Sequence, residues 1–437
     1  MGDLIRDRDS LLGKEVSLCG WVDRVRDHGK LRFIILRDRT GQIQLVVKQG
    51  ETPEEAVKAS NEARDEAVIC VKGTLRKAPT KEGVEVAVRE MSVLNRPVEP
   101  LPLLPRDSLS AILDTRLKFR WLDVRNPKVT QIFLLQAWVA QKFREYFSSK
   151  GFVEIFTPKI VGAGTEGGAE VFPVIYFGKP AFLAQSPQFY KQFSVIAGLE
   201  RVFEIGPVFR AEPHHTTRHL TEYHSMDVEV GFIQSYYDVI SFVEGFVRHL
   251  AEAMRKEELP QRVLQEYNVE PLEIPGEVPK IPLRKAYEIL DSEFKKHIPY
   301  GEDLDSEGER MLGQYVRERF KSDLVFVTEY PWKVRPFYTM RKEDEPDWTY
   351  SFDGLLRGLE IATGGQREHR YERLVENVKD KGMNPKNFEF YLNFFKHGAP
   401  PHGGAGLGLE RITMQSLKLE NIREARLLPR DPETLLP

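Results

Sequence analysis

Five short segments with alternating apolar and polar side chains lie between residues 14 and 97, and they limit what the first part of the chain can fold into. They are EVSLCGWV, LRFIILRD, GQIQLVV, AVICVKGTL and VEVAVREMSVL. Strict alternation over a short run is typical of half-buried strands. One helix-like segment, TPEEAVKASNEAR, separates the third run from the fourth. Five strands with one helix predict a small Greek-key β-barrel of the OB-fold type over residues 1–100.

The pattern changes after the last of these strands. Residues 101–125 are rich in proline and show little periodicity, which predicts a linker. Over residues 126–437 the helix-like run VTQIFLLQAWVAQKFREYFSSKG leads into FVEIFTPKIV and then into further strand-like runs. This mixture predicts an α+β fold, with helices flanking an antiparallel sheet. Residues 256–345 are more charged and less regular, and we expect them to decorate that sheet as an insertion.

The charge balance neither requires nor excludes a nucleic-acid partner. The 437 residues include 63 Lys and Arg against 66 Asp and Glu, a net charge of -3. Any RNA would therefore have to meet a local basic surface rather than a global field. The length suits two or three domains and exceeds what a small binding module needs.

The two cysteines and the hydropathy of the chain indicate its surroundings. Cys19 and Cys70 lie in apolar, strand-like runs without a CxxC spacing, so we expect buried free thiols and neither a disulfide nor a zinc site. No apolar run approaches the ~20 residues that a membrane span needs. The first residues, MGDLIRDRDSLLGKE, carry no signal-peptide hydrophobic block. The sequence therefore predicts a soluble, cytoplasmic protein with no membrane partner.

The segment FRAEPHHTTRHLTEY is highly charged for a turn between two strand-like runs, and it contains no glycine. Alternation puts Arg210 and Glu212 on one face of a strand, about 7 Å apart. Arg218 and His219 follow at the return, and Tyr223 lies on the facing strand. The planar fork of arginine suits phosphate, and a tyrosine ring offers a stacking surface, so the set predicts a nucleotide site. The alternative is a solvated hairpin whose charges pair with one another.

Two further segments favour a nucleotide over that alternative. SFDGLLRGLEIATGGQREHR places Asp353 and Glu360 near the ends of an apolar strand, with Thr363 just beyond. Two carboxylates and a hydroxyl are hard oxygen ligands suited to Mg²⁺, although they could also be strand-edge charges. GGAGLGLERITMQSL predicts a glycine-rich strand followed by a helix with Arg411 in its first turns. Helix packing explains such glycines as well as phosphate binding does.

Three segments together resemble a known family. FVEIFTPKI with its closing Pro158, FRAE followed by RHLTEY, and GLGLERI are similar to motifs 1, 2 and 3 of the class II aminoacyl-tRNA synthetases, in the expected order and spacing. The resemblance extends over nearly the whole chain, because the N-terminal barrel has the place and pattern of an anticodon-binding domain. That domain belongs to the subclass that charges aspartate, asparagine and lysine. The resemblance implies ATP as a substrate, Mg²⁺ as a cofactor and tRNA as a partner.

The amino-acid specificity is predicted from AQSPQFYKQ and GGQREHR. Lys191 and Arg367 converging on one pocket favour a substrate carboxylate, whereas a lysine substrate would need acidic partners. QSPQFYKQ resembles the aspartyl family, in which the equivalents of Gln188 and Lys191 contact aspartate and the equivalent of Arg367 pairs with its side chain. Asparaginyl enzymes usually lack this lysine. An asparaginyl enzyme or an aspartate-amidating paralogue, and a non-catalytic RNA-binding protein, are the alternatives.

Three acids near this pocket have candidate roles in holding aspartate. TEGGAEVF resembles the mobile loop that closes over aspartate, with Glu166 and Glu170 as candidate contacts, although a plain surface turn would look the same. Asp227 matches a family acid that helps to hold the substrate amino group, and a structural ion pair is the alternative.

The resemblance implies a reaction in two steps and a role for each motif residue. The α-carboxylate of aspartate attacks the α-phosphate of ATP, and the terminal 3′-hydroxyl of tRNA then takes the aspartyl group. The implied assignments are Arg210 to the α-phosphate, Glu212 to the adenine amino group, Tyr223 to adenine stacking, Arg218, His219 and Arg411 to the β- and γ-phosphates, and Asp353, Glu360 and Thr363 to Mg²⁺. Arg210 and Arg411 are the catalytic residues of this set, Glu360 also belongs to the ATP site, and Thr363 also belongs to the aspartate site. The family usually has serine where Thr363 stands, and His214 and His215 have no assignment.

The barrel carries candidate contacts for the anticodon. Phe33 and Gln44 lie on adjacent strand-like runs, where an aromatic ring can stack on a base while an amide contacts its edge. A phenylalanine in a strand is otherwise most often a core residue. The resemblance adds the equivalents of Arg26 and Glu85, and implies tRNA(Asp) as the partner. Members that discriminate against tRNA(Asn) tend to carry a tryptophan where this chain has Asp23, so we favour relaxed specificity that includes tRNA(Asn).

The resemblance also implies a homodimer. The long helix before Pro158 is similar to the class II dimer element, and its apolar face would pack across a twofold axis. An ordinary core helix is the alternative.

Overall fold

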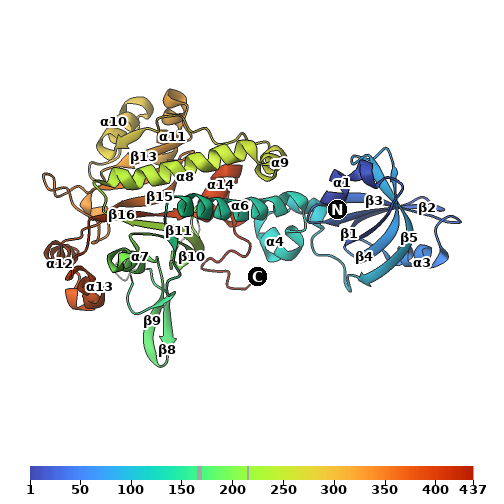
Figure 1. Cartoon of the computed structure of the whole chain (residues 1–437), viewed down its shortest axis with the longest axis horizontal. Coiled ribbons are helices and arrows are strands. Elements are labelled where there is room, and N and C mark those ends of the chain that lie inside the picture. Colours follow the sequence, from blue (N-terminus) through green and yellow to red (C-terminus); the bar gives the residue numbers. More distant parts are fainter. Residues whose placement is uncertain (165–169, 214–215, 437) are drawn as a thin grey trace. The chain divides into compact units, whose positions relative to one another are not determined.

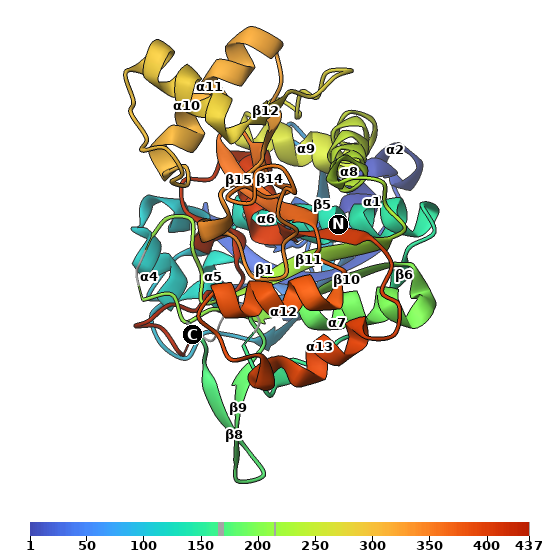
Figure 2. The same ribbon diagram turned by 90° about the vertical axis from the view of Figure 1, so that its left-hand side faces the viewer.

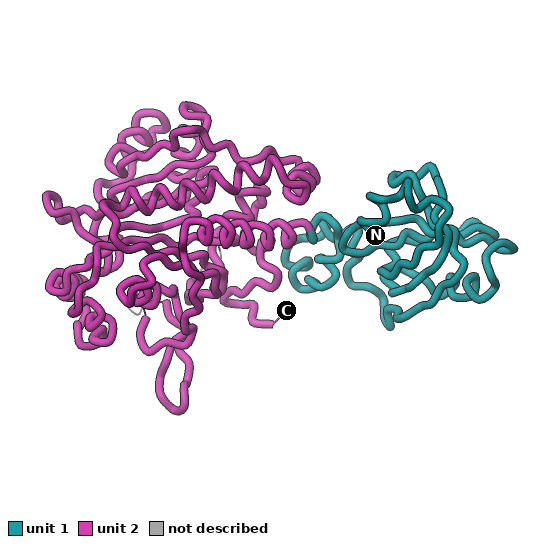
Figure 3. Tube along the Cα trace, viewed as in Figure 1, with its two compact units in different colours: residues 1–130, 437 teal, residues 131–436 magenta. Residues whose placement is uncertain are grey.

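The computed structural model describes residues 1–164, 170–213 and 216–436. The chain forms two compact units, Met1–Thr130 and Gln131–Leu436 (Figure 3). The segment predicted as a linker therefore counts with the first unit.

The first unit contains a closed barrel of five strands in the order β1-β2-β3-β5-β4 (Figure 1). The strands are β1 (Glu15–Asp27), β2 (Leu31–Asp38), β3 (Gly41–Lys48), β4 (Val68–Lys77) and β5 (Val84–Asn95). Adjacent strands are antiparallel except β3 and β5, and α3 (Glu54–Glu62) lies between β3 and β4 along the chain. The predicted OB-type barrel is confirmed.

The alternation in the sequence builds the core of this barrel. Val22, Ile34, Leu36 and Leu45 are completely buried, whereas Trp21, Phe33, Ile35 and Gln44 beside them are half-buried. The unit also contains α1 (Gly2–Arg6), α2 (Arg8–Leu11), η1 (Pro105–Ser110), α4 (Leu113–Lys118) and α5 (Arg120–Asp123).

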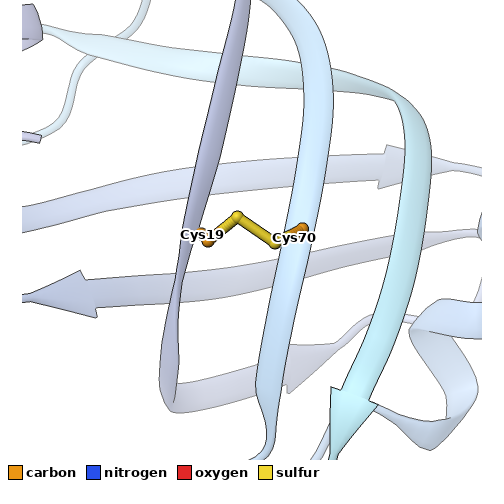
Figure 4. The surroundings of a disulfide bond; sticks show 2 residues. All are labelled: Cys19 and Cys70. Atoms are coloured by element: carbon orange, nitrogen blue, oxygen red, sulfur yellow. A yellow bond between two sulfur atoms is a disulfide. The ribbon is translucent and has the colours of Figure 1, made fainter.

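The expectation for the cysteines is wrong. Cys19 on β1 and Cys70 on β4 are direct cross-strand partners and form a disulfide (Figure 4). Cys19 is exposed and Cys70 is half-buried, because both side chains point away from the barrel core. Apolar neighbours in the sequence suggested burial, but the register of two strands distant in the sequence decides which side chains meet.

The second unit is built on a sheet with eight strands among the described residues, in the order β12-β13-β14-β15-β16-β11-β10-β6. Their bounds are β6 (Val153–Glu154), β10 (Arg201–Phe209), β11 (Glu222–Gly231), β12 (Lys280–Pro282), β13 (Leu324–Thr328), β14 (Ser351–Leu356), β15 (Leu359–Gln366) and β16 (His402–Gly408). Most neighbours are antiparallel, but β6 runs parallel to β10 and β12 runs parallel to β13. The α+β class is confirmed, and the sheet is mixed rather than antiparallel throughout. A separate three-stranded sheet contains β7 (Ile160–Val161), β9 (Lys179–Leu183) and β8 (Pro173–Tyr176).

The helices of this unit surround the sheet. They are α6 (Pro127–Ser149), α7 (Gln188–Ser194), α8 (Tyr236–Lys256), α9 (Glu258–Tyr267), α10 (Leu283–Phe294), α11 (Ser306–Phe320), α12 (Tyr371–Asp380), α13 (Glu389–Phe395) and α14 (Leu409–Leu417). Short helical turns are η2 (Val195–Leu199), η3 (Trp332–Val334), η4 (Pro385–Phe388) and η5 (Ile422–Ala425). None of the helices in the described ranges is long and apolar enough to cross a membrane.

Aromatic side chains fix the main helices on the sheet. Phe143 of α6 packs against Phe203 of β10 and Phe246 of α8, with ring centroids 5.8 and 5.1 Å apart. A second cluster joins α7, α12 and α13, which lie together in Figure 2, and includes Phe189 and Tyr391.

The segment 256–345 does more than decorate the sheet. It contains α9, α10 and α11, as expected for a covering layer, but it also supplies β12 and β13, which form one edge of the sheet. All five residues of β13 are buried, so this short run is part of the core.

The run predicted as one apolar strand around Asp353 is a hairpin of β14 and β15. The chain turns at Arg357 and Gly358, which have φ angles of +48° and +75°. Two consecutive residues with positive φ are typical of the tight turn that suits the twist of a hairpin. The turn brings Asp353 directly opposite Thr363.

Candidate active site

A cavity of about 350 Å³ lies in the second unit and collects most of the predicted site residues. Twelve of them line it: Gln188, Lys191, Arg210, Glu212, Arg218, His219, Tyr223, Asp227, Glu360, Thr363, Arg367 and Arg411. They come from α7, β11, β15 and the residue that follows it, α14, and the connection between β10 and β11. The motifs are thus neighbours in space although they are separated along the chain.

One wall of the cavity is the connection that follows β10. Arg210 comes directly after β10, and its backbone N–H donates to the carbonyl of Thr221 at 2.9 Å. Tyr223 stands opposite Val208 in the β10–β11 pair. Burial raises the pKa of Tyr223, so the ring remains a neutral phenol at physiological pH. Arg210, Glu212 and Tyr223 therefore line one cavity, although Arg210 and Glu212 lie after the end of β10 and not on a strand as predicted.

Arg218 has a partner that the sequence analysis did not identify. Its NH2 and NH1 groups donate to Glu309 Oε1 and Oε2 at 2.9 and 3.1 Å, and NH1 also donates to Ser306 Oγ at 2.8 Å. Burial raises the pKa of Glu309 to about 7, with Glu360 adding to the effect and Arg218 opposing it. Glu309 lies on α11, within the segment that carried no motif.

His219 and Arg411 lie at the same end of the cavity. Burial, followed by the charges of Arg411, Arg218 and Arg210, lowers the pKa of His219 to about 4. His219 Nδ1 is hydrogen-bonded to the hydroxyl of Thr216 at 2.7 Å. Three arginines and a neutral imidazole at this end offer donors that suit a polyphosphate, and two of the arginines are paired with Glu309 and Glu360.

Arg411 connects this end to the predicted metal ligands. Its NH1 group donates to the Glu360 carboxylate at 2.9 Å and to the Glu360 carbonyl at 2.8 Å. Arg411 is the third residue of α14, directly after the glycine-rich strand, as predicted.

The predicted magnesium ligands lie on the β14–β15 hairpin, and their chemistry fits a cation. Asp353 is only 4% exposed, and its Oδ1 has no hydrogen-bond partner in the described part of the chain. Burial raises the pKa of Asp353, the nearby Glu360 adds to the rise, and Arg335 opposes it. A buried carboxylate with a free oxygen is stabilised by a cation. The described residues contain no group of three or more His, Cys, Asp or Glu side chains that could hold a metal. The predicted set is of a different kind, because it has only two carboxylates and completes them with one hydroxyl.

The pocket predicted for the amino acid contains three buried ion pairs, made by two cations and two acids. Lys191 Nζ lies 2.9 Å from Asp227 Oδ1 and 3.4 Å from Glu229 Oε2. Arg367 Nε donates to Glu229 Oε1 at 3.0 Å. Burial acts to raise the pKa of Glu229, but Arg367 and Lys191 outweigh it and hold the pKa below its usual value. Lys191 and Arg367 converge as predicted, but two acids balance their charges.

Glu229 explains part of the glycine-rich strand. A Cβ atom at Gly404 on β16 would collide with the Glu229 carboxylate and with the backbone carbonyl of Val228. The glycine thus lets β16 lie against the strand that carries the acid. The two readings of this run were phosphate binding and helix packing, and Gly404 instead serves the contact between two strands. The only sequence signal for Glu229 was its alternation with Asp227 on β11.

Some predicted residues lie elsewhere. Glu166 lies outside the described residues, as do His214 and His215. Glu170 is described and exposed, it is absent from the cavity lining, and its backbone carbonyl accepts from Ala211 N at 2.8 Å. Gln188, in contrast, does line the cavity: its side chain is buried in the wall and donates to Gln192 Oε1 at 2.8 Å.

A second cavity lies on the barrel, within the first unit. The four predicted anticodon residues, Arg26, Phe33, Gln44 and Glu85, all line it. Phe33 is half-buried rather than part of the core. Glu85 accepts from Gln44 Nε2 at 2.7 Å and from Arg76 Nε at 2.8 Å, so the amide and a guanidinium are fixed side by side. An aromatic face beside oriented donors is the arrangement that OB folds present to single-stranded nucleic acid.

Comparisons with known proteins agree with both sites. Residues 16–94 match the OB-fold nucleic acid binding domain, and residues 113–432 match the tRNA synthetases class II (D, K and N). The chain is 66% identical, over all of its length and 99% of the relative, to the aspartate–tRNA(Asp/Asn) ligase of Aeropyrum pernix. It is 45% identical, over 98% of both chains, to the aspartate–tRNA(Asp) ligase of Pyrococcus furiosus.

Solved structures share the whole fold. An asparaginyl-tRNA synthetase from Pyrococcus horikoshii complexed with asparaginyl-adenylate has a TM-score of 0.89 and 32% identity, and the match covers 98% of this chain and 97% of that one. An aspartyl-tRNA synthetase from Entamoeba histolytica has a TM-score of 0.88 and 31% identity, covering 98% of this chain and 91% of that one. The chain belongs to the class II aminoacyl-tRNA synthetases of the aspartate, lysine and asparagine group.

Proposed function

We propose that this chain is an aspartate–tRNA ligase that activates L-aspartate with ATP and transfers the aspartyl group to the 3′-hydroxyl of tRNA. One observation carries the proposal: a single cavity joins the nucleotide wall of Arg210 and Tyr223 to a pocket that contains Lys191 and Arg367. The names of the two relatives reported above support the choice of aspartate.

Activation needs positioning rather than a strong base. The α-carboxylate of aspartate is already ionised at neutral pH, and it can attack the α-phosphate directly. Arg210 holds the α-phosphate, Tyr223 stacks on adenine and Glu212 accepts from the adenine amino group. Fixed donors around the phosphates stabilise the charge that develops in the transition state.

The leaving pyrophosphate is held at the other end of the cavity. Arg218, His219 and Arg411 bind the β- and γ-phosphates there. Asp353, Glu360 and Thr363 would hold magnesium, which would further neutralise the charge of the phosphates.

Recognition of aspartate depends on Arg367 and Lys191. Arg367 presents a planar fork to the side-chain carboxylate of the substrate, and Lys191 supports it with a second positive charge. Asp227 holds the substrate ammonium group, and Gln188 contacts the substrate. Glu166 and Glu170 remain the candidate acidic contacts of aspartate.

The test of this assignment is the variant Arg367→Lys, which keeps the positive charge beside buried Glu229 but removes the fork. We expect kcat/KM for aspartate, measured by ATP–pyrophosphate exchange, to fall by about 10²-fold or more, as is typical when a buried charged contact is lost. Arg373→Lys is the matched control, since Arg373 is exposed on α12 and pairs only with Glu376 in the described contacts. Unchanged aspartate-dependent exchange in Arg367→Lys would contradict the assignment.

An asparaginyl activity is the second candidate, because one of the structures with this fold carries asparaginyl-adenylate. Exchange that depends on asparagine but not on aspartate in the wild-type protein would select it. Complete absence of adenylate formation with either amino acid would instead favour a non-catalytic RNA-binding protein.

The tRNA range of the enzyme includes both tRNA(Asp) and tRNA(Asn). The 66% identical relative is named for both tRNAs, which supports this range. Asp23 is buried, and its carboxylate accepts from Arg37 NH1 at 2.6 Å. It does not line the barrel cavity. The cavity therefore has no side chain from this position that could reject tRNA(Asn). Charging assays on the two tRNAs test the range, and strict rejection of tRNA(Asn) would refute it.

The protein acts in the cytoplasm as a homodimer. Val153, Phe156 and Ile160 of the first motif are 46%, 84% and 51% exposed, and β6 is the last strand at its edge of the sheet. An apolar surface beside an open strand suits a twofold contact between two copies.

A further inference from the structure

Arg335 lies in the active-site cavity but belongs to none of the three motifs. It follows η3, in the charged segment before β14. Its NH2 group lies 2.8 Å from Asp353 Oδ2, and its NH1 group donates to Thr363 Oγ1 at 2.9 Å. The guanidinium therefore bridges two of the three groups assigned to magnesium.

The position of Arg335 is fixed from its other side. The Cζ atom lies 3.8 Å from the ring centroid of Tyr330, which is almost fully buried. Arginine stacks on such a ring in a way that lysine does not. The Arg335 side chain is 11% exposed, so the bridge lies in a largely desolvated part of the cavity.

When no other cation is bound, the positive charge of Arg335 is needed to balance the negative charge of Asp353. Asp353 is buried, and Glu360 is a second negative group nearby. Glu360 already has Arg411 as its partner. Without Arg335, Asp353 would be a buried carboxylate with no compensating charge, which is strongly unfavourable.

We propose that Arg335 is the built-in counter-cation of the Asp353–Thr363 pair, and that it competes with a divalent cation for this pair. The inference rests on the proposed function, because it takes Asp353 and Thr363 as metal ligands. Arg335 is thus a positioning residue that sets how strongly the enzyme holds a divalent cation before ATP arrives.

The competition links cation binding to phosphate binding. Arg335 Nε and NH2 make no hydrogen bond within the described residues, so NH2 is held to Asp353 as an ion pair without a formed hydrogen bond. An anionic phosphate in the cavity offers an acceptor to Arg335 and weakens its hold on Asp353. The site therefore favours a cation that arrives together with ATP over one that binds alone.

The test measures cation binding without catalysis. Mn²⁺ is titrated into the full-length, nucleotide-free protein, and the free ion is followed by electron paramagnetic resonance. We expect Arg335→Met to lower the Kd for Mn²⁺ by roughly tenfold or more, because a competing positive charge within hydrogen-bond distance has been removed. The same titration with ATP present should show a smaller difference between Arg335→Met and the wild type.

Arg341→Met is the matched control. Arg341 also stacks on an aromatic ring, that of Trp332 at 4.9 Å, and also pairs with an aspartate, Asp380 at 2.6 Å. It does not line the cavity. Its replacement should leave the Mn²⁺ affinity unchanged, and an equal change in both variants would overturn the proposal.

Two further variants separate this inference from the assignment of the metal site. Asp353→Asn should abolish the tight binding in the Arg335→Met background. If Asp353→Asn has no effect there, the metal site itself is misassigned. If Asp353→Asn abolishes binding but Arg335→Met does not tighten it, the site stands and the role of Arg335 is refuted.

Stability provides a second readout in case Arg335→Met folds poorly. In a chelator, its melting temperature should fall below that of the wild type because Asp353 is left without a cation. Mn²⁺ should raise the melting temperature of Arg335→Met by more than that of the wild type. An equal rise in both proteins would show that Arg335 only anchors the loop.

Discussion

At the scale of single residues, the ionisable groups of the cavity are set far from their ordinary behaviour. His219 is held neutral by burial and by three arginines, and its pKa is about 4. Glu309 keeps its proton to about pH 7 because it is buried. His219 lines the end of the cavity assigned to the β- and γ-phosphates, and Glu309 is connected to that end through Arg218, so the titration of both groups should report what binds there.

The first prediction concerns His219. A phosphate beside the ring favours the charged imidazolium, so ATP binding should raise the pKa of His219 from about 4. Between about pH 4 and the pKa of the complex, binding should therefore take up a proton. Calorimetry in buffers of different ionisation enthalpy measures this uptake at about pH 5.5. His219→Gln should take up less, and equal uptake by the two proteins would contradict the phosphate contact.

The second prediction concerns Glu309, whose pKa in the folded protein is about 7 against an ordinary value of 4.5. Between these pH values the folded state binds more protons at Glu309 than the unfolded state does. The contribution of Glu309 to the free energy of unfolding should therefore decrease as the pH rises through this window, by up to about 3 kcal/mol. Denaturant unfolding of the wild type and Glu309→Gln across the window measures the difference.

The variant Glu309→Gln has a matched control on the same helix, α11. Glu318 is exposed, and its carboxylate accepts from Gln314. Glu318→Gln should follow the wild-type pH dependence. A wild-type-like slope in Glu309→Gln would show that Glu309 is ionised in the folded protein at lower pH.

The residues that the sequence analysis missed have a common physical reason. Glu229, Glu309 and Arg335 are charged side chains in strands, helices or loops that could equally be solvated. Their importance comes from burial and from their partners. Glu229, for example, pairs with Arg367, which is more than a hundred residues away in the sequence. Motif residues such as Arg210 and Arg411 were predicted because their order along the chain is itself distinctive.

At the scale of elements, the contact between α11 and the β14–β15 turn sets the spacing of the cavity. A Cβ atom at Gly313 of α11 would lie 2.5 Å from Gly358 Cα, so the helix backbone lies directly on the turn. One turn of the helix away, Glu309 accepts from the backbone N–H of Glu360 at 3.1 Å. The two glycines thus allow the approach that places Glu309 beside Arg218.

The third prediction tests this contact. Gly313→Ala should force α11 away from the turn and destabilise the protein by about 1–3 kcal/mol, because the added Cβ would clash with backbone atoms rather than with a flexible side chain. It should also raise the KM for ATP, since Arg218 loses its support. Gly276→Ala is the control, as a Cβ there meets nothing within 4 Å. Equal stability and equal KM in both variants would contradict the role of the contact.

Elements were predictable where local pattern and burial agree. The barrel strands alternate, and α6 carries a long helical periodicity, so both were predicted from the sequence alone. The β14–β15 turn was missed because its first residue is Arg357, which rarely adopts positive φ, rather than the Asn, Asp or Gly of the common hairpin signals. The strand β13 was missed because its four apolar residues and Thr328 stand inside a strongly charged segment.

At the scale of the whole molecule, each compact unit has its own core and its own candidate site. The barrel core is made from residues of the first unit, and the amino-acid activation site lies wholly in the second. A change confined to the barrel should therefore leave adenylate formation intact. The disulfide and the exposed first motif allow one test in each unit.

The fourth prediction concerns the disulfide. It closes a loop across 51 positions and joins β1 to β4, so its removal should destabilise the barrel by about 4 kcal/mol on chain-entropy grounds. The double variant Cys19→Ser with Cys70→Ser should unfold at lower denaturant in this unit. Its rate of aspartate-dependent pyrophosphate exchange should equal that of the wild type, and a lower rate would show that the barrel affects activation.

The fifth prediction concerns the dimer. Phe156→Glu places a charge on the exposed first motif, and sedimentation should show a shift from dimer to monomer. Phe177→Glu is the control, because Phe177 is 90% exposed at the end of β8, outside that motif. If both variants remain dimeric, the twofold contact lies elsewhere.

The outward-facing disulfide also has a practical consequence at the bench. Thiol reagents are routine additions during purification, and Cys19 is exposed to them. A preparation reduced in this way would pass an activity check based on amino-acid activation and yet differ from the oxidised protein in the half that meets the anticodon. Batches of this enzyme should therefore be compared by mobility on a non-reducing gel and by an assay that includes tRNA.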